Sequence, residues 1–307
     1  MKRRAAVILG HEDGRYFIDV ASGLCKSGCL YCYVQNHQQE SINYIEFSDL
    51  LDYLISDPNF MPGEQGTLLL IGAHSDLFST SELSLAAIHL VKSLAPLGNP
   101  IQLSTKSFIK EEWTRELSIY QVHNSQLIVF VSCSTILQWE KYEPNTASPQ
   151  TRLQTINNLN KVSILNCLLI KPFLPSVTNK EVELLIDTCN SHSPKAVCVG
   201  SFYLNHSIAA NLNLISNNYH DVKLYSHPLM DNCFGVIHPP EDFILKLLDG
   251  LVDIPIFKST PCVIAYLQQR YCPIFVWKKY PKLCVQCQDC DSLYNSFTKS
   301  KTELITY

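Results

Sequence analysis

Three cysteines near the start of the chain, Cys25, Cys29 and Cys32, have a spacing that could hold a metal centre. They lie in the segment CKSGCLYC. Cysteine thiolates are the ligands of iron–sulfur clusters, which usually have four of them. The next cysteine is Cys133, far along the chain. A cluster held by three cysteines leaves one iron open to a small molecule, so this spacing indicates a catalytic centre rather than a structural one.

A zinc site is the main alternative for the same residues. His37 follows the three cysteines and would complete a Cys3His set, which suits structural zinc. Chance spacing is a third explanation, because the chain contains 13 cysteines. The spacing favours the cluster over both alternatives and leaves them open.

Composition is that of a globular protein large enough for one large core or two small ones. The chain has 307 residues, of which 46% are hydrophobic and 17% charged. Its net charge is −4 and its pI about 6.2. This charge argues against a general nucleic-acid coat protein, which would carry a basic field, but leaves a local basic groove open.

The N-terminal apolar run, residues 5–9, is too short for the hydrophobic region of a signal peptide. No uninterrupted apolar stretch approaches the ~20 residues that span a membrane. We therefore expect a soluble, cytoplasmic protein, in which cysteines serve metal or redox chemistry more often than disulfides. Cys167, Cys189 and Cys198 lie in apolar runs and are expected to pack in the core.

Buried strands and amphipathic helices alternate along the first two thirds of the chain. The expected strands are 16–21, 67–73, 100–105, 126–132, 164–171 and 196–202. The expected helices are 47–56, 83–94, 149–161 and 179–190, with a capping box of Ser79 and Glu82 before the second. This alternation predicts an α/β fold, a partial (β/α)6 TIM-like barrel. Such barrels place catalytic residues at the carboxyl ends of the strands, and the cysteine segment follows the first strand.

The alternation fades after about residue 205. We therefore expect a barrel domain over 1–205 and a C-terminal cap over 206–307, with a helix at 241–251. The cap contains a second cysteine group: Cys262, Cys272, Cys284, Cys287 and Cys290. This group predicts an auxiliary [4Fe–4S] cluster or a structural zinc. The nearby segment 277–282 interleaves lysines with aromatic residues, as a nucleic-acid groove would, although a solvated loop is the plainer interpretation.

The cysteine segment resembles the signature of the radical S-adenosylmethionine (SAM) superfamily. More closely, it resembles the spore photoproduct lyase-like (DNA repair photolyase) group, in which tyrosines flank the last cysteine as Tyr31 and Tyr33 do here. Further segments of this chain that resemble the group are STKS at 104–107, YEP at 142–144 followed by Arg152, and KPFLP at 171–175. The resemblance spans roughly residues 15–200.

The resemblance implies a [4Fe–4S] cluster on Cys25, Cys29 and Cys32 whose open iron binds SAM. In that superfamily, one electron from the cluster cleaves SAM and produces a 5′-deoxyadenosyl radical, which abstracts hydrogen from the substrate. Carried over to this chain, the resemblance implies cofactor-binding roles for Tyr31, Ser75, Lys106, Ser132 and Glu143. The ordinary alternatives are a solvated lysine, capping serines and an exposed acid. Arg152 is expected to be a structural ion-pair partner.

Two departures from the pattern bear on the reaction. The Gly-Gly-Glu sequence of many radical SAM proteins is replaced by Gly72-Ala73-His74, with Asp76 the nearest acid. Spore photoproduct lyase also uses a cysteine near this position to return hydrogen, and none occurs between Cys32 and Cys133. The sequence therefore disfavours repair by the same mechanism. Tyr33 and Cys133 are the candidate catalytic hydrogen donors.

The sequence thus favours a radical SAM enzyme acting on a small-molecule or peptide substrate in a biosynthetic pathway. Its expected electron donor is a reducing partner such as flavodoxin or ferredoxin. Repair or modification of nucleic acid is the first alternative, suggested by the family. A non-catalytic zinc or iron–sulfur scaffold is the second.

Overall fold

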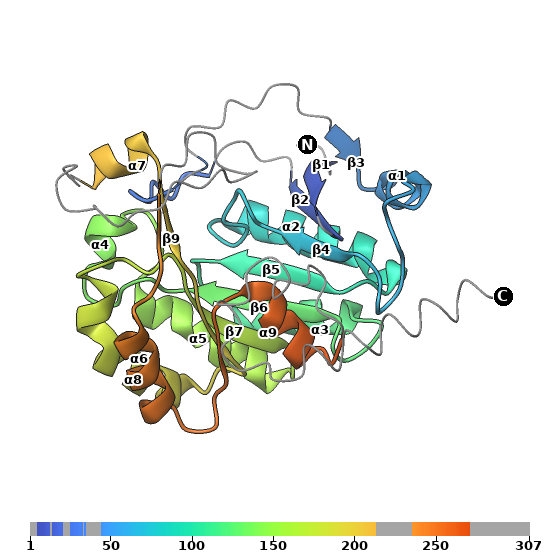
Figure 1. Ribbon diagram of the computed structural model, residues 1–307. Coiled ribbons are helices and arrows are strands. Elements are labelled where there is room, and N and C mark those ends of the chain that lie inside the picture. Colours follow the sequence, from blue (N-terminus) through green and yellow to red (C-terminus); the bar gives the residue numbers. More distant parts are fainter. Residues whose placement is uncertain are drawn as a thin grey trace, which may run out of the picture.

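The computed structural model describes residues 5–12, 14–20, 25–32, 34, 44–212 and 235–270, and the following account concerns these residues. Its main feature is a nine-stranded sheet with the order β11-β8-β7-β6-β5-β4-β2-β1-β3 (Figure 1). From β11 to β2 in this order, neighbouring strands pair in parallel. At the β2 edge, β1 pairs antiparallel with both β2 and β3. The parallel strands are Arg15–Val20 (β2), Leu68–Ile71 (β4), Ile101–Thr105 (β5), Leu127–Ser132 (β6), Leu165–Ile170 (β7), Val197–Val199 (β8) and Ile256–Phe257 (β11). The predicted partial barrel is confirmed.

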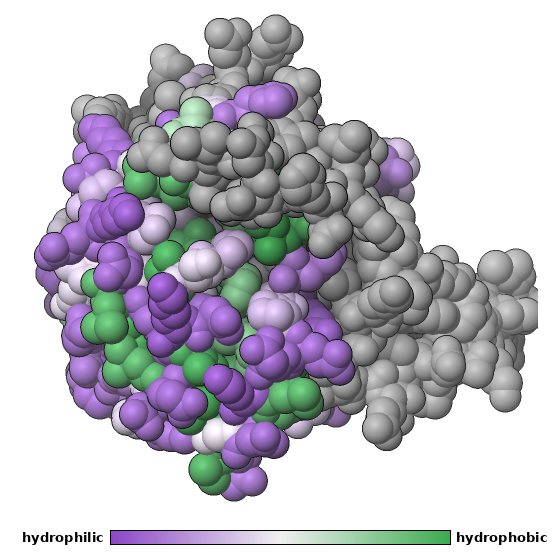
Figure 2. Space-filling view, turned by 60° about the vertical axis from the view of Figure 1, so that its left-hand side comes forward, coloured by the Kyte–Doolittle hydropathy of each residue, from purple (hydrophilic) through white to green (hydrophobic). Residues whose placement is uncertain are grey.

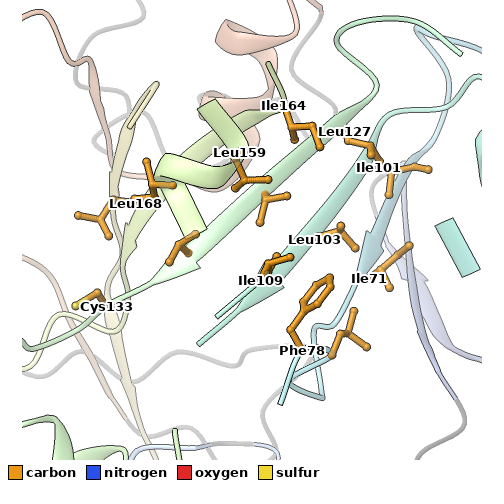
Figure 3. Packing of buried hydrophobic residues seen from close by; sticks show 14 of the residues in the cluster. Ile71, Phe78, Ile101, Leu103, Ile109, Leu127, Cys133, Leu159, Ile164 and Leu168 are labelled. Carbon is orange, nitrogen blue, oxygen red and sulfur yellow. The ribbon is translucent and has the colours of Figure 1, made fainter. Parts of the chain in front are cut away.

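Helices cover the outer face of this sheet. They are Leu50–Ser56 (α1), Ser81–Leu94 (α2), Glu111–Tyr120 (α3), Pro149–Lys161 (α5), Val182–His192 (α6) and Glu241–Gly250 (α8). Alternate strand residues such as Ile71, Leu103 and Leu168 pack against them in one continuous apolar core (Figure 3). This core fixes the strands, and so fixes where each strand ends.

The inner face of the sheet carries the other set of alternate residues. Phe17, Leu70 and Phe130 pack there against helix α9 (Thr260–Leu267) in a second apolar cluster. Cys167 and Cys198 belong to it and, like Cys189 in the outer core, are buried, which confirms the prediction that they are packing residues.

The six predicted strands are all present, with ends that differ by at most a few residues. The apolar run at residues 5–9 belongs to strand β1 (Ala5–Glu12), which with β3 (Tyr44–Glu46) was not predicted. Helix α3 was also not predicted. The predicted capping box is wrong in its first residue, because the side chain of Thr80, not Ser79, accepts the hydrogen bond from Leu83 N at the start of α2. Ser79 instead donates to the carbonyl of Asp76.

The described residues after 200 form one small separate sheet and also extend the main sheet and its helical layer. Strands β9 (Phe202–Leu204) and β10 (Gly235–Ile237) form a small antiparallel sheet, and helix α7 (His206–Asn211) follows β9. Helix α8 packs on α6, and β11 extends the main sheet beside β8. The described part of the expected cap thus continues the layers of the barrel, and the boundary at 205 stays a prediction. None of the described helices is long and apolar enough to cross a membrane.

Candidate active site at the carboxyl ends of the strands

The cysteine segment follows strand β2 and rests on the segment after helix α4 (Trp139–Tyr142), at the end of the molecule to which β5 points in Figure 1. Leu30 N donates to Tyr142 O at 3.0 Å, and Asn145 N donates to Ser27 O at 3.3 Å. Gly28 has a φ of +63°, in the left-handed region that glycine adopts without cost. A Cβ atom there would lie 3.2 Å from Asn145 Nδ2. Glycine at this position therefore lets the segment turn and stay close to its support.

Cys29 is buried, and Cys25 and Cys32 are partly exposed. A turn joins the last two, in which Cys32 N donates to Cys29 O at 3.0 Å. Burial raises the pKa of the Cys29 thiol to about 12, and the nearby ammonium of Lys106 opposes that rise. The segment thus carries three thiols, and a cation from another strand lies near that of Cys29.

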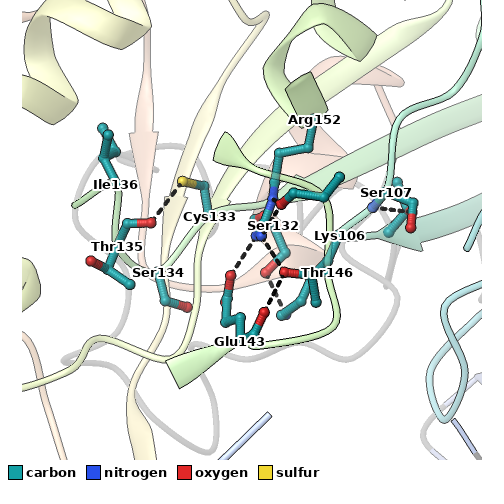
Figure 4. Close-up of polar contacts among 12 residues, drawn as sticks. Lys106, Ser107, Ser132, Cys133, Ser134, Thr135, Ile136, Glu143, Thr146 and Arg152 are labelled. Carbon is teal, nitrogen blue, oxygen red and sulfur yellow. Dashed lines mark hydrogen bonds and ion pairs between the residues drawn. The ribbon is translucent and has the colours of Figure 1, made fainter. Parts of the chain in front are cut away.

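The segment contacts a buried ion pair between Glu143 and Arg152, which Figure 4 shows. Arg152 Nη1 donates to Glu143 Oε2 at 2.6 Å, and neither side chain is exposed. The other oxygen of Glu143 accepts a hydrogen bond from the hydroxyl of Tyr31. Burial, followed by the Glu143 charge, raises the pKa of Tyr31 well above its usual range, so this tyrosine donates as a neutral phenol. The expected structural ion-pair role of Arg152 is confirmed, and Glu143 is not the exposed acid of the alternative interpretation.

Arg152 uses its remaining donors on the surrounding backbone. Its guanidinium also donates to Ser132 O at 2.9 Å, Thr146 Oγ1 at 2.6 Å, and Ala147 O at 2.9 and 2.6 Å. A buried arginine is tolerated only where its charge and its hydrogen-bond donors are satisfied. The side chain therefore joins the end of β6 to the segment that supports the cysteines.

Asp76 fixes the turn that carries Lys106. Its carboxylate accepts hydrogen bonds from Thr105 Oγ1 at 2.6 Å, Ser107 Oγ at 2.9 Å and Lys106 N at 3.3 Å. This buried acid is therefore engaged within the protein. It holds the backbone of Lys106 and the side chains of the residues on both sides of it.

The side chain of Lys106 lies between the cysteine segment and strand β6. Its Nζ donates to Ser132 Oγ at 2.8 Å and lies 5.6 Å from the centre of the Tyr31 ring. Lys106 forms no ion pair with any residue that the structure describes. A partly exposed ammonium held in this way is suited to bind a carboxylate.

Ser75 meets an acid that sequence reasoning missed. Its Oγ donates to Asp19 Oδ1 at 2.5 Å, which joins the ends of β4 and β2. Asp19 is buried, and its Oδ2 has no hydrogen-bond partner among the described residues. Burial raises the pKa of Asp19 to about 6 against the effect of these hydrogen bonds. An acidic residue near the end of an otherwise apolar strand was the available signal.

The other predicted site residues lie elsewhere. Cys133 is fully buried, and its Sγ points to Thr135 O, 3.5 Å away, on the side away from Lys106 (Figure 4). Burial raises the pKa of its thiol to about 12. Cys262 is buried on α9 beside apolar side chains. The remaining predicted residues lie outside the described ranges: Tyr33, His37, Cys272, Cys284, Cys287 and Cys290.

Comparison with known proteins gives no match in sequence and clear matches in structure. No protein-family model matches the chain, and no curated protein sequence does. Spore photoproduct lyase complexed with dinucleoside spore photoproduct superimposes with a TM-score of 0.54 at 11% identity, over 76% of this chain and 73% of that one. This chain has the fold of spore photoproduct lyase. A double mutant of the lyase with bound AdoMet and dinucleoside spore photoproduct gives a TM-score of 0.56 at 12% identity, over 80% of this chain and 76% of that one.

This result confirms the resemblance inferred from the cysteine segment at the level of the fold. At sequence identities of 11 and 12%, the comparison shows a shared fold and nothing more. The roles of individual residues therefore rest on their chemistry and positions in this chain.

Proposed function

We propose that this protein is a radical SAM enzyme in which Cys25, Cys29 and Cys32 hold a [4Fe–4S] cluster. One observation carries the proposal. The ammonium of Lys106 lies between the aromatic ring of the cysteine segment and Ser132, at the carboxyl ends of a parallel sheet. This is where barrel enzymes bind their ligands, and a cation near the Cys29 thiol suits a carboxylate ligand that also reaches the metal.

The chemistry of the donor set fits a cluster. Cys25, Cys29 and Cys32 supply three thiolates from one short segment, and thiolates are the ligands of iron–sulfur clusters. His37, which would complete a Cys3His zinc set, lies outside the described residues.

When bound, the cluster and SAM would supply one-electron cleavage and a 5′-deoxyadenosyl radical able to abstract hydrogen. Lys106 binds the SAM carboxylate, and Ser132 holds the ammonium in place. Glu143, whose two oxygens are taken by Tyr31 and Arg152, acts by fixing the cysteine segment. Ser75 and Asp19 offer a polar pair on the neighbouring strand ends.

We assign a small-molecule or peptide substrate to the enzyme, with a flavodoxin or ferredoxin as the electron donor in the cytoplasm. The acidic net charge and the absence of a cysteine between Cys32 and Cys133 support this choice. Nucleic acid is the second candidate. It is favoured by the fold, because the matching lyase structures hold dinucleoside spore photoproduct.

The proposal is tested by the spectrum of the reconstituted protein. After anaerobic reconstitution and reduction, electron paramagnetic resonance is recorded with and without SAM. A [4Fe–4S] signal that changes on addition of SAM is the expected result, because SAM binds the open iron. A Cys25/Cys29/Cys32→Ala variant should lose this signal. Bound zinc, or a cluster signal that SAM leaves unchanged in the intact protein, would contradict the proposal.

A further inference from the structure

A second lysine, Lys171, follows strand β7 at the same end of the sheet. Side chains alternate between the two faces of a strand, and Cys167 and Leu169 lie on the inner face. Lys171 continues that set of alternate positions, so it projects to the inner side, as Lys106 does from β5. The Lys171 side chain is exposed to solvent.

Gly200 makes room for this lysine. A Cβ atom at Gly200 would lie 2.5 Å from Lys171 Cδ and 2.6 Å from its Cγ, closer than packed atoms allow. The φ angle of Gly200 lies outside the left-handed region, so its backbone does not require glycine. The contact does. The stem of Lys171 lies across the end of strand β8 only because that position has no side chain.

The Lys171 ammonium lies beside an aromatic ring. Its Nζ lies 5.9 Å from the centre of the Tyr203 ring, and it forms no ion pair within the described ranges. Arg15 is a second cation nearby.

Burial lowers the pKa of Lys171, and Arg15 adds to that effect, while Cys198 opposes it. Protein surrounds the Lys171 side chain on most sides, and solvent still reaches it. The exposure matters more here, because it shows that a ligand can approach.

Ser132 links the two lysines. It accepts the hydrogen bond from Lys106 Nζ at 2.8 Å and donates to Lys171 O at 3.3 Å. Strand β6 separates β5 from β7, and neighbouring strands lie about 4.8 Å apart, so the two lysine backbones are roughly 10 Å apart. A ligand bound at Lys106 therefore leaves Lys171 for a different anionic group.

We propose that Lys171 is a substrate-binding residue that receives an oxyanion, either a carboxylate or a phosphate. This proposal rests on the proposed function, in which Lys106 binds SAM. It identifies the substrate as an anionic molecule whose charged group lies across β6 from the SAM carboxylate. A carboxylate would point to an acid or a peptide, and a phosphate to a nucleotide or nucleic acid.

The test follows the Lys171 side chain by NMR in reconstituted, unreduced protein that is saturated with SAM. Protein labelled with [ε-13C]lysine is titrated with acetate, methyl phosphate and, as a neutral control, methanol. The Lys171 signal is assigned by its loss in Lys171→Ala. We expect acetate or methyl phosphate, but not methanol, to shift this signal in a saturable way. The anion that binds more tightly identifies the kind of substrate group that Lys171 receives.

Two variants separate placement from charge. Gly200→Ala keeps every charge but displaces the Lys171 stem, and it should weaken anion binding at least tenfold. Lys92→Ala is the matched control, because Lys92 also lies over a tyrosine ring, Tyr120, but on the outer helical layer. That variant should bind anions as the unmodified protein does.

The proposal is overturned by an unchanged Lys171 signal with both anions, or by anion binding that Gly200→Ala leaves intact. Loss of SAM affinity in Lys171→Ala would also overturn it, by making Lys171 a cofactor ligand. SAM cleavage without substrate is measured separately, as 5′-deoxyadenosine. Lys92→Ala should retain it, and its absence in unmodified protein would count against the proposed function alone.

Discussion

Glu143 and Arg152 form an ion pair of 2.6 Å in which neither side chain is exposed. The same glutamate accepts a hydrogen bond from Tyr31, which lies between two of the three clustered cysteines. The pair thus connects helix α5, which carries Arg152, to the segment that carries the proposed metal ligands. It is the basis of the first prediction.

Glu143→Gln should lower the free energy of unfolding by about 3–5 kcal/mol, because it leaves the guanidinium of Arg152 buried without a countercharge. The measurement is denaturant unfolding of the reconstituted protein. Glu140→Gln, an exposed acid three residues earlier, is the control and should change stability little. A loss of less than about 1 kcal/mol in Glu143→Gln would show that the pair is not needed.

Lys106→Ala should weaken SAM binding roughly 10- to 100-fold, since a hydrogen bond to a charged group is worth about 1.5–3 kcal/mol. Its iron content should stay unchanged, because Lys106 is not a metal ligand. Equilibrium dialysis with labelled SAM measures the affinity. Lys110→Ala, which removes an exposed lysine from the start of α3, serves as the control. Equal SAM affinity in the unmodified protein, Lys106→Ala and Lys110→Ala would show that Lys106 does not bind SAM.

Gly28→Ala should weaken the cysteine segment, because an L-residue at a φ of +63° costs about 1 kcal/mol and its Cβ would crowd Asn145. We expect faster loss of iron to a chelator than in unmodified protein. Lys26→Ala, an exposed position in the same segment, controls for the substitution itself. Iron loss at the rate of that control would mean that the turn is not required.

Asp19 should make stability depend on pH. Its folded-state pKa, about 6, lies above its usual value of 3.8, so its contribution is fully present below about pH 4 and is lost as pH rises through 6. The loss is about 3 kcal/mol. Asp19→Asn removes this titration, so its stability relative to unmodified protein should rise by about that amount between pH 4 and pH 7.

Denaturant unfolding at several pH values measures the Asp19 effect. Asp52→Asn, at an exposed position of α1, is the control and should follow the unmodified protein at every pH. A pH-independent difference between Asp19→Asn and the unmodified protein would refute the assignment.

The strands could be predicted from sequence because parallel strands buried on both faces are continuous apolar runs. Helix α3 could not be predicted, because Thr114 and Leu117 are its only buried residues and give only a weak helical periodicity of apolar positions. The cap of α2 was misplaced by one residue because Ser79 and Thr80 both carry hydroxyls. Only the extended backbone of Thr80, with φ −140° and ψ 156°, decides between them.

The site was predictable where its chemistry is local in sequence. The cysteine segment is one short motif, and Lys106 stands at the end of an apolar run. The partnership of Tyr31 with Glu143 joins residues 112 apart in the chain, and that of Asp76 with Ser107 joins residues 31 apart. Such contacts arise only when the strands are placed side by side. The same is true of the contact between Lys171 and Gly200.

The most direct test of the account is the reaction itself. Reconstituted protein is incubated with dithionite and SAM without oxygen, and 5′-deoxyadenosine is quantified beside the Cys25/Cys29/Cys32→Ala variant. The account predicts 5′-deoxyadenosine from the unmodified protein and none above background from the variant. Iron that remains in the variant would indicate a second cluster at the C-terminal cysteines. No 5′-deoxyadenosine from unmodified protein that carries a reduced [4Fe–4S] cluster would contradict the central claim.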